Sequence, residues 1–142
     1  MSPSVTNCKT LVYLAGPYTR PDPVLNVHNT CKVADRVLEM GLIPFIPHLT
    51  HTYHLVSPKP VDFWYEYDIH MMRRCDLVMR IPGESTGADR EVAAAKAAGI
   101  PVVKGLEGLD AWRMGKATKR LRKLTEADCD GIIREFRRAT GQ

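Results

Sequence analysis

The chain has 142 residues, of which 44% are hydrophobic and 25% charged, and its formal net charge at pH 7 is +4. A chain of this size and composition can bury a core without metal ions or disulfides, so we expect one globular domain over residues 1–142. No apolar stretch reaches membrane-spanning length, and the amino terminus lacks the pattern of a secretory signal. We therefore expect a cytoplasmic protein with no membrane partner.

Short apolar runs that end at glycine, proline or polar residues predict four strands, and helical spacing of apolar residues predicts the helices between them. The strands are expected at Leu11–Ala15, Leu42–Ile46, Leu77–Ile81 and Ile100–Val103. The helices are expected at Val24–Met40 (ended by Gly41), Val61–Arg74, Thr86–Ala98 and Glu126–Ala139 (with Thr125 as its N-cap). A polar, histidine-rich loop is expected from about Pro47 to Pro60.

Strands that alternate with helices predict a parallel sheet with right-handed crossovers. The fold class is therefore α/β, a three-layer open sheet of Rossmann or flavodoxin type with an added carboxyl-terminal helical segment. Ligands of such sheets bind beyond the carboxyl ends of the strands. Three polar segments follow predicted strand ends, and we expect them to converge there: Gly16–Arg20, Pro47–His54 and Pro82–Glu91.

The segment Gly83–Glu91 combines features of an anion site with a carboxylate. Its glycines, Gly87 among them, allow backbone to approach a ligand, and the helix expected from Thr86 offers free amide groups. Ser85 can cap that helix or donate to a phosphate. Glu91 can face the same crevice, or it can be an ordinary acidic residue favoured early in a helix by the dipole.

Two further residues can cooperate with Glu91. Asp68 lies on the helix expected before the third strand, and two carboxylates near one pocket can divide nucleophilic and acid–base work. The alternative for Asp68 is a solvent-facing carboxylate. Tyr13, on the first strand, points either into the core or toward the crevice, where its hydroxyl would need a partner such as Glu91.

Histidines recur at every third position, at His48, His51 and His54. On a helical turn this spacing approximates a metal-binding face, but no Asp, Glu or Cys completes a coordination shell, so hydrogen bonding of His48 or His51 to substrate or core is favoured. Arg20 is a candidate ligand for a phosphate or carboxylate, with a surface arginine as the alternative. There is no GxGxxG, P-loop or zinc-binding cysteine spacing, and we expect no cofactor.

Positive charge is concentrated at the end of the chain. Residues 105–142 hold 9 Lys and Arg against 6 Asp and Glu, whereas residues 1–104 hold 11 against 10. Such a basic segment can bind nucleic acid or form a solvated helix face. Aromatic residues that would stack on bases are not interspersed among its basic residues, so we favour the solvated face and expect no nucleic-acid partner.

Three motifs together resemble the nucleoside 2-deoxyribosyltransferase superfamily, which includes the 2′-deoxynucleoside 5′-phosphate N-hydrolases. They are Val12–Pro17 before a long helix, Tyr67-Asp68 before Cys75–Val78, and Ser85-x-Gly87-x-x-x-Glu91. The segment Pro47–His51 is similar to an uncharacterised phage and bacterial branch of that superfamily. The resemblance covers residues 10–104 as a core and leaves residues 105–142 as a basic helical extension.

The resemblance implies cleavage of the N-glycosidic bond of a nucleoside or nucleoside 5′-monophosphate, by hydrolysis or by transfer to another base. Glu91 would be the nucleophile, Asp68 would bind the sugar or protonate the leaving base, and Tyr13 would orient Glu91. A small-molecule substrate and a homo-oligomer are implied. The substrate-binding candidates are Gly16, Arg20, His48, Ser85, Gly87, Asp89 and Arg90.

Asp89 and Arg90 depart from the superfamily, whose better-known members favour glycine and an aromatic residue there. Two charges beside the nucleophile can change the base that is accepted, or direct Arg90 to a phosphate. A protein can keep a fold after the activity associated with it has been lost. The alternative is therefore a non-catalytic module that binds or senses a nucleotide in the same crevice.

Overall fold

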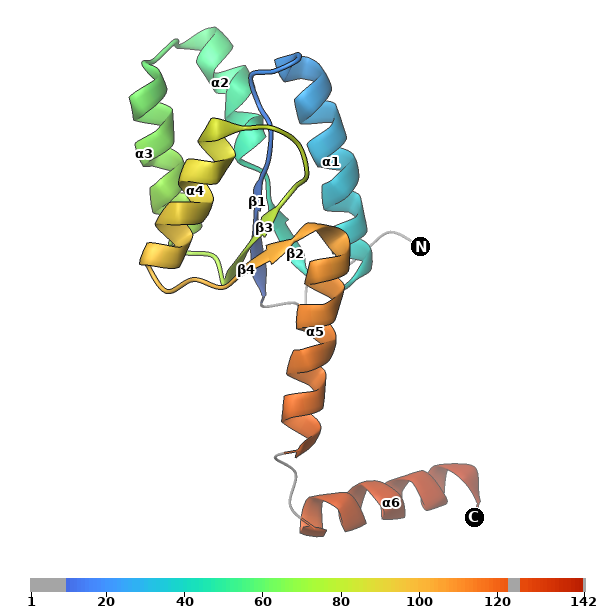
Figure 1. Cartoon of the computed structure of the whole chain (residues 1–142). Helices are drawn as coiled ribbons and strands as arrows, with labels where there is room; N and C mark the ends of the chain where they lie inside the picture. Colours follow the sequence, from blue (N-terminus) through green and yellow to red (C-terminus); the bar gives the residue numbers. More distant parts are fainter. Residues whose placement is uncertain (1–9, 123–125, 142) are drawn as a thin grey trace. The chain divides into compact units, whose positions relative to one another are not determined.

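The computed structural model describes residues 10–122 and 126–141. The chain divides into two units, one ending at Asp110 and the other beginning at Ala111, and each is described by itself. The elements of the fold, shown in Figure 1, are β1 (Leu11–Ala15), α1 (Pro23–Glu39), β2 (Ile43–Phe45), η1 (Pro47–Leu49), α2 (Thr50–Val56), α3 (Val61–Met72), β3 (Leu77–Arg80), α4 (Thr86–Ala97), β4 (Val102–Lys104), α5 (Gly105–Arg122) and α6 (Glu126–Thr140).

The four strands form one parallel sheet in the order β2-β1-β3-β4, which confirms the predicted α/β class. Tyr13 in β1 lies opposite Phe45 in β2 and Val78 in β3. Pro44 is accommodated because β2 is an edge strand, where a missing backbone donor costs least. It lies opposite Val12 in the register of β1 and β2.

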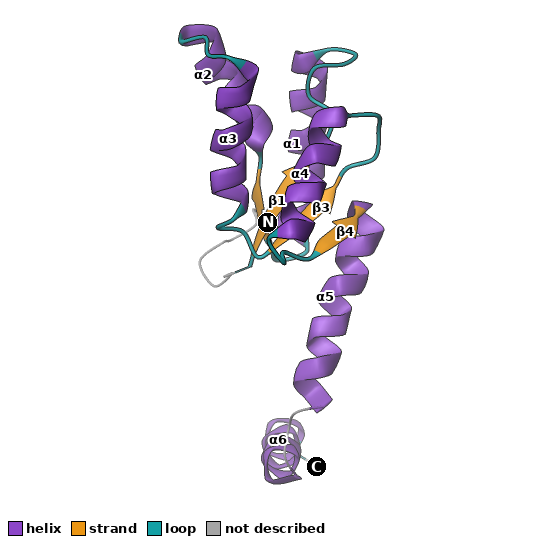
Figure 2. Ribbon diagram, turned by 60° about the vertical axis from the view of Figure 1, so that its left-hand side comes forward, coloured by secondary structure: helices purple, strands orange, loops and turns teal. Residues whose placement is uncertain are grey.

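Helices cover both faces of this sheet: α1 lies on one face, and α3 and α4 lie on the other (Figures 1 and 2). From β1 the chain steps to β2 in one direction, and from β3 it steps to β4 in the other. Right-handed crossovers in opposite directions place their helices on opposite faces. The direction reverses between β1 and β3, and this is the point at which ligands bind in open α/β sheets.

The core between the sheet and the pair α3 and α4 is built from alternate strand residues. Tyr13 and Ala15 of β1 share it with Val78 of β3, because side chains two apart in a strand point to the same face. The helical side contributes Met72, Cys75, Ala88 and Ala95. Tyr13 is therefore directed toward the helices that carry Asp68 and Glu91.

The predicted loop at residues 47–60 is wrong, because the structure has the 3-10 helix η1 and the helix α2 there. No residue of α2 is buried, and Leu55 and Val56 are exposed. Helices are recognised in a sequence by an apolar face that packs on a core, and α2 has none. The fourth strand also begins two residues later than predicted, at Val102, after Pro101.

Most other boundaries agree with the sequence within one or two residues. Gly41 has φ of 78°, as a residue that ends α1 requires. The Ser85 side chain accepts a hydrogen bond from the Ala88 amide and caps α4. The predicted cap Thr125 lies outside the described residues.

The second unit consists of the end of α5 and all of α6. In α5, Lys116 Nζ lies 5.4 Å from the ring centroid of Trp112. The length and apolar character needed to cross a bilayer occur together in no helix within residues 10–122 and 126–141.

Candidate active site

A cavity of about 710 Å³ is formed by segments that the topology brings to the reversal point of the sheet. It is lined by the loop after β1, by residues of η1 to α3, and by the start of α4. Eight of the ten predicted site residues line it, namely Gly16, Arg20, His48, Asp68, Ser85, Gly87, Arg90 and Glu91. Tyr13 and Asp89 do not.

Glu91 lies on α4, and its Oε1 accepts a hydrogen bond of 2.9 Å from the hydroxyl of Tyr13. The Tyr13 side chain is fully buried and its ring stacks on Phe45, so the hydroxyl is held in place. Burial raises the pKa of Glu91 to about 7, although the Tyr13 hydrogen bond and the charge of Arg80 both lower it. Burial, followed by the charge of Glu91, raises the pKa of Tyr13, which therefore remains a donor.

Asp68 reaches the same cavity from α3. Its Oδ1 is buried and makes no hydrogen bond within the described part of the chain. Burial and then the negative charge of Glu91 raise its pKa to about 8. Two interacting buried carboxyls lose their protons one after the other, so near neutral pH one of the pair can be ionised while the other keeps its proton.

The amino end of α4 supplies donors to the cavity. Ser85 Oγ accepts the Ala88 amide at 3.1 Å, which leaves the hydroxyl proton of Ser85 available to another acceptor. A Cβ added to Gly87 would meet only Ser85 Oγ, at 3.9 Å. The protein itself therefore leaves room for a side chain at this position, and the use of Gly87 by a substrate stays a prediction.

His48 is buried, and its Nε2 lies 2.9 Å from the carbonyl oxygen of Pro17. A carbonyl only accepts, so Nε2 carries the proton and Nδ1 is an acceptor. Nδ1 is buried and bonds to no group among the described residues. Burial lowers the pKa of His48, and the carbonyls of Pro17 and Gly16 oppose this only in part. A neutral acceptor therefore lines the cavity.

The other two histidines bond to protein groups rather than to a shared centre. His51 Nδ1 bonds to the hydroxyl of Tyr18. His54 Nδ1 accepts the indole N–H of Trp64 at 2.7 Å. Within residues 10–122 and 126–141, no group of three or more His, Cys, Asp or Glu could hold a metal ion.

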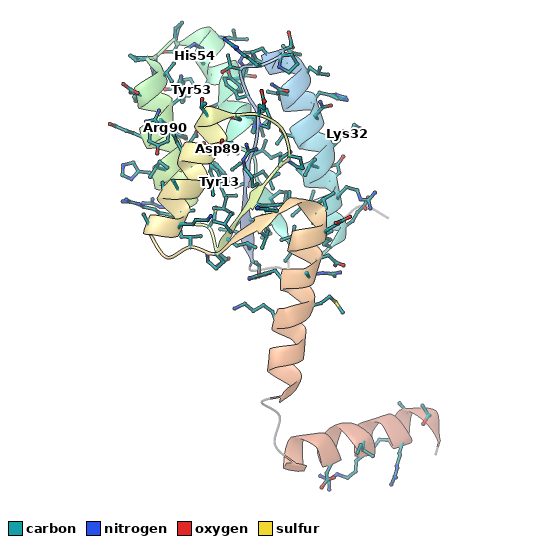
Figure 3. All side chains as sticks on the ribbon, viewed as in Figure 1. Tyr13, Lys32, Tyr53, His54, Asp89 and Arg90 are labelled. Carbon is teal, nitrogen blue, oxygen red and sulfur yellow. The ribbon has the colours of Figure 1, made fainter. Side chains whose placement is uncertain are left out.

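The adjacent charged residues Asp89 and Arg90 have different surroundings, although both lie on α4 (Figure 3). The guanidinium of Arg90 stacks on the ring of Tyr65, 4.0 Å from its centroid, and lines the cavity. Asp89 is not among the residues that line the cavity, and its role as a binding residue stays a prediction. Its carboxylate is 70% exposed and pairs with Arg80 at 3.0 Å.

Several residues of the cavity wall were not predicted from the sequence, above all Trp64, Tyr65 and Lys59. Trp64 and Tyr65 precede Asp68 by four and three residues, a spacing that puts all three on one helix face. That spacing was a usable signal. Lys59 lies between helices α2 and α3 and has no such periodic signal.

Gly83 holds the two loops of the site close together. Its φ is 126°, and a Cβ there would lie 2.8 Å from Cγ of Pro17. We expect Gly83→Ala to destabilise the protein by about 1–3 kcal/mol, because it combines backbone strain with this clash. Chemical denaturation measures this, with Gly115→Ala as the control, since a Cβ at Gly115 meets nothing within 4 Å. Equal stability of the two variants would contradict the close approach.

Comparison with known proteins gives the family and supports the fold. No curated protein matches the chain. The solved 2-deoxyribosyltransferase of Bacillus psychrosaccharolyticus is 21% identical, with a TM-score of 0.48 over 67% of this chain and 71% of that one. The 2-deoxyribosyltransferase of Leishmania mexicana is 20% identical, with a TM-score of 0.52 over 68% of this chain and 63% of that one, and shares the fold. Residues 10–104 match the family described as a domain of unknown function (DUF7768), and since the match spans more than half of the chain, the protein belongs to that family.

Proposed function

We propose that this protein cleaves the N-glycosidic bond of a nucleoside or a nucleoside 5′-monophosphate, with Glu91 as the nucleophile. The observation that carries the proposal is the geometry of two carboxyls in one cavity: Glu91, whose Oε1 accepts a hydrogen bond of 2.9 Å from the hydroxyl of Tyr13, and Asp68, whose buried Oδ1 bonds to no group in the described part of the chain. The motifs that resemble deoxyribosyltransferases, and the fold shared with the Leishmania enzyme, support the same reaction class.

The site supports a double-displacement reaction. Tyr13 holds Oε1 of ionised Glu91, and the carboxylate attacks the anomeric carbon as the C–N bond breaks. Protonated Asp68 donates its proton to the departing base. Water, or a second base, then attacks the glycosyl–enzyme ester, releases Glu91 and returns a proton to Asp68.

The cations of the cavity favour a 5′-phosphate on the substrate. Arg20, Lys59 and Arg90 line it together with the amino end of α4, where free amides and the helix dipole attract anions. Neutral His48 offers Nδ1 as an acceptor, suited to an amino group of the base or a sugar hydroxyl.

A homo-oligomer is part of this proposal. Exposed apolar side chains occur on α2 and α3, such as Val56 at 82% and Val61 at 79% exposure, and Val61 lines the cavity. A second copy that covered them would also exclude water from the glycosyl–enzyme ester. Sedimentation velocity measures the assembly, and a monomer at all concentrations would contradict this part.

The test is incubation with a panel of nucleosides and their 5′-monophosphates, with and without a second free base, while the released base is followed by chromatography. We expect release from at least one 5′-monophosphate, and exchange of bases if transfer competes with water. Glu66→Gln, on the exposed side of α3, is the matched control and should retain activity. Saturable binding of a nucleotide with no base released would instead support the non-catalytic alternative.

A further inference from the structure

Arg80 is a charged residue of the site region that the proposed chemistry does not use. It ends β3, and its side chain is only 15% exposed. Its Nε and Nη2 lie 3.2 and 3.0 Å from Oδ1 of Asp89. Nη2 also donates to the carbonyl of Gly83 at 2.9 Å, and Nη1 donates to the carbonyl of Ile81.

These contacts join three parts of the segment that leads to Glu91. Ile81 and Gly83 belong to the loop after β3, and Asp89 belongs to the first turn of α4. Glu91 follows Asp89 by two residues in the same helix. One guanidinium therefore links the end of the strand, the loop and the start of the helix that carries the proposed nucleophile.

The planar guanidinium of arginine suits these partners, which are two backbone carbonyls and one carboxylate. Donors at fixed angles meet two backbone carbonyls and a carboxylate at once, whereas a lysine ammonium is a point charge on a flexible stem. The ion pair alone would contribute little, because Asp89 is 70% exposed and such pairs are weak in water. The carbonyl contacts give the linkage its geometry.

Arg80 also acts on Glu91 through charge. Three groups interact with the Glu91 carboxyl: Tyr13 of β1 through a hydrogen bond, and Asp68 of α3 and Arg80 of β3 through charge. Arg80 is the positive one among them, and its charge favours ionised Glu91. Position and charge can be separated by substitution, because lysine keeps the charge but not the planar guanidinium.

We propose that Arg80 is the positioning residue for Glu91, because its guanidinium fixes the β3–α4 loop and the first turn of α4 so that the carboxylate meets Tyr13 and faces the cavity. The kinetic part of this proposal rests on the proposed function. The structural part does not, since it concerns the protein without substrate.

The experiment compares wild type, Arg80→Lys and Arg80→Met, with Arg36→Met as the control. Arg36 is an exposed arginine of α1 paired with Glu39. Glutamate labelled with ¹³C in the carboxyl group reports the titration of Glu91, identified by the signal lost in Glu91→Gln. Base release from a nucleoside 5′-monophosphate gives kcat and KM, and thermal unfolding verifies that each variant is folded.

We expect kcat to fall about 10–100-fold in both Arg80 variants, with KM changed less, because a displaced nucleophile loses reactivity more than substrate binding. The pKa of Glu91 should rise in Arg80→Met and stay near that of wild type in Arg80→Lys and Arg36→Met. If Arg80→Met does not fold, Arg80→Lys tests the positioning role by itself. A lower kcat together with an unchanged pKa of Glu91 would then support that role.

Wild-type kcat in Arg80→Lys would overturn the positioning role. An unchanged Glu91 titration in folded Arg80→Met would overturn the proposed interaction between the two residues. If wild type releases no base from any substrate, the proposed function fails. The chemical shift of the Glu91 carboxyl carbon then tests the positioning role alone. A changed chemical shift in Arg80→Lys would support that role, and an unchanged one would overturn it.

Discussion

Replacing Glu91 by glutamine is expected to lower kcat for base release by about 10⁴-fold or more, since an amide of the same shape cannot attack the anomeric carbon. The hydroxyl of Tyr13, now 2.9 Å from Oε1 of Glu91, can still donate to the amide oxygen. The variant should therefore fold and bind nucleotide. Chromatographic detection of the free base, with calorimetric binding of the same nucleotide, measures both properties.

Asp68→Asn should show a smaller loss of about 10²–10³-fold, typical of a removed general acid. The reduction in kcat caused by Asp68→Asn should be smaller for a substrate whose base leaves without protonation. The reduction caused by Glu91→Gln should be the same for both kinds of substrate. Comparison of two substrates with poor and good leaving groups tests this, beside Glu66→Gln as the unreactive neighbour on α3. A deeper loss in Asp68→Asn than in Glu91→Gln would mean that the two carboxyls exchange roles. Full activity in Glu91→Gln would remove it as the nucleophile.

The fold was readable from the sequence because its signals are local. Each strand is a short apolar run, and each long helix that packs on the sheet repeats its apolar residues at helical spacing. The contact between Tyr13 and Glu91, 78 residues apart, was one of two alternatives for Tyr13, the other being packing in the core alone. The carboxyl half of β1 and the start of α4 must meet where a parallel sheet reverses direction.

The parts that were missed depend on geometry across loops. Asp89 precedes Glu91 by two residues, but residues two apart on a helix point to different sides, and the Asp89 carboxylate pairs with Arg80. The sequence of α2 has no apolar residues at helical spacing, because none of its side chains has to pack against a core. Lys59 reaches the cavity from a connection whose path the spacing of residues does not determine.

The two site carboxyls should make the protein less stable as the pH rises. Their pKa values in the folded chain, about 7 for Glu91 and about 8 for Asp68, exceed the ordinary values of 4.5 and 3.8. A group that binds its proton more tightly in the folded state favours folding while it is protonated. The stabilisation of the folded state by these two bound protons is complete below about pH 4. It is lost as the pH rises through the folded-state pKa values, about 7 for Glu91 and about 8 for Asp68.

Asp68→Asn isolates the effect, because asparagine resembles the protonated acid and never ionises. The difference in unfolding free energy between variant and wild type should be small at pH 4.5. It should favour the variant by about 4–6 kcal/mol at pH 8.5, given roughly 1.4 kcal/mol for each unit of the rise in the pKa of Asp68 from 3.8 to about 8. Urea denaturation at both pH values measures this, with Glu66→Gln as the control for an exposed carboxyl of α3.

An equal difference at both pH values would show that Asp68 ionises as readily in the folded chain as in the unfolded one, and the acid role would lose its physical basis. The expected result links stability to chemistry. Burial raises the pKa of both carboxyls, which allows one of them to keep a proton near neutral pH, and the same burial opposes folding once both are charged. A variant that is more stable at alkaline pH and releases base more slowly would show that one feature of the site determines both properties.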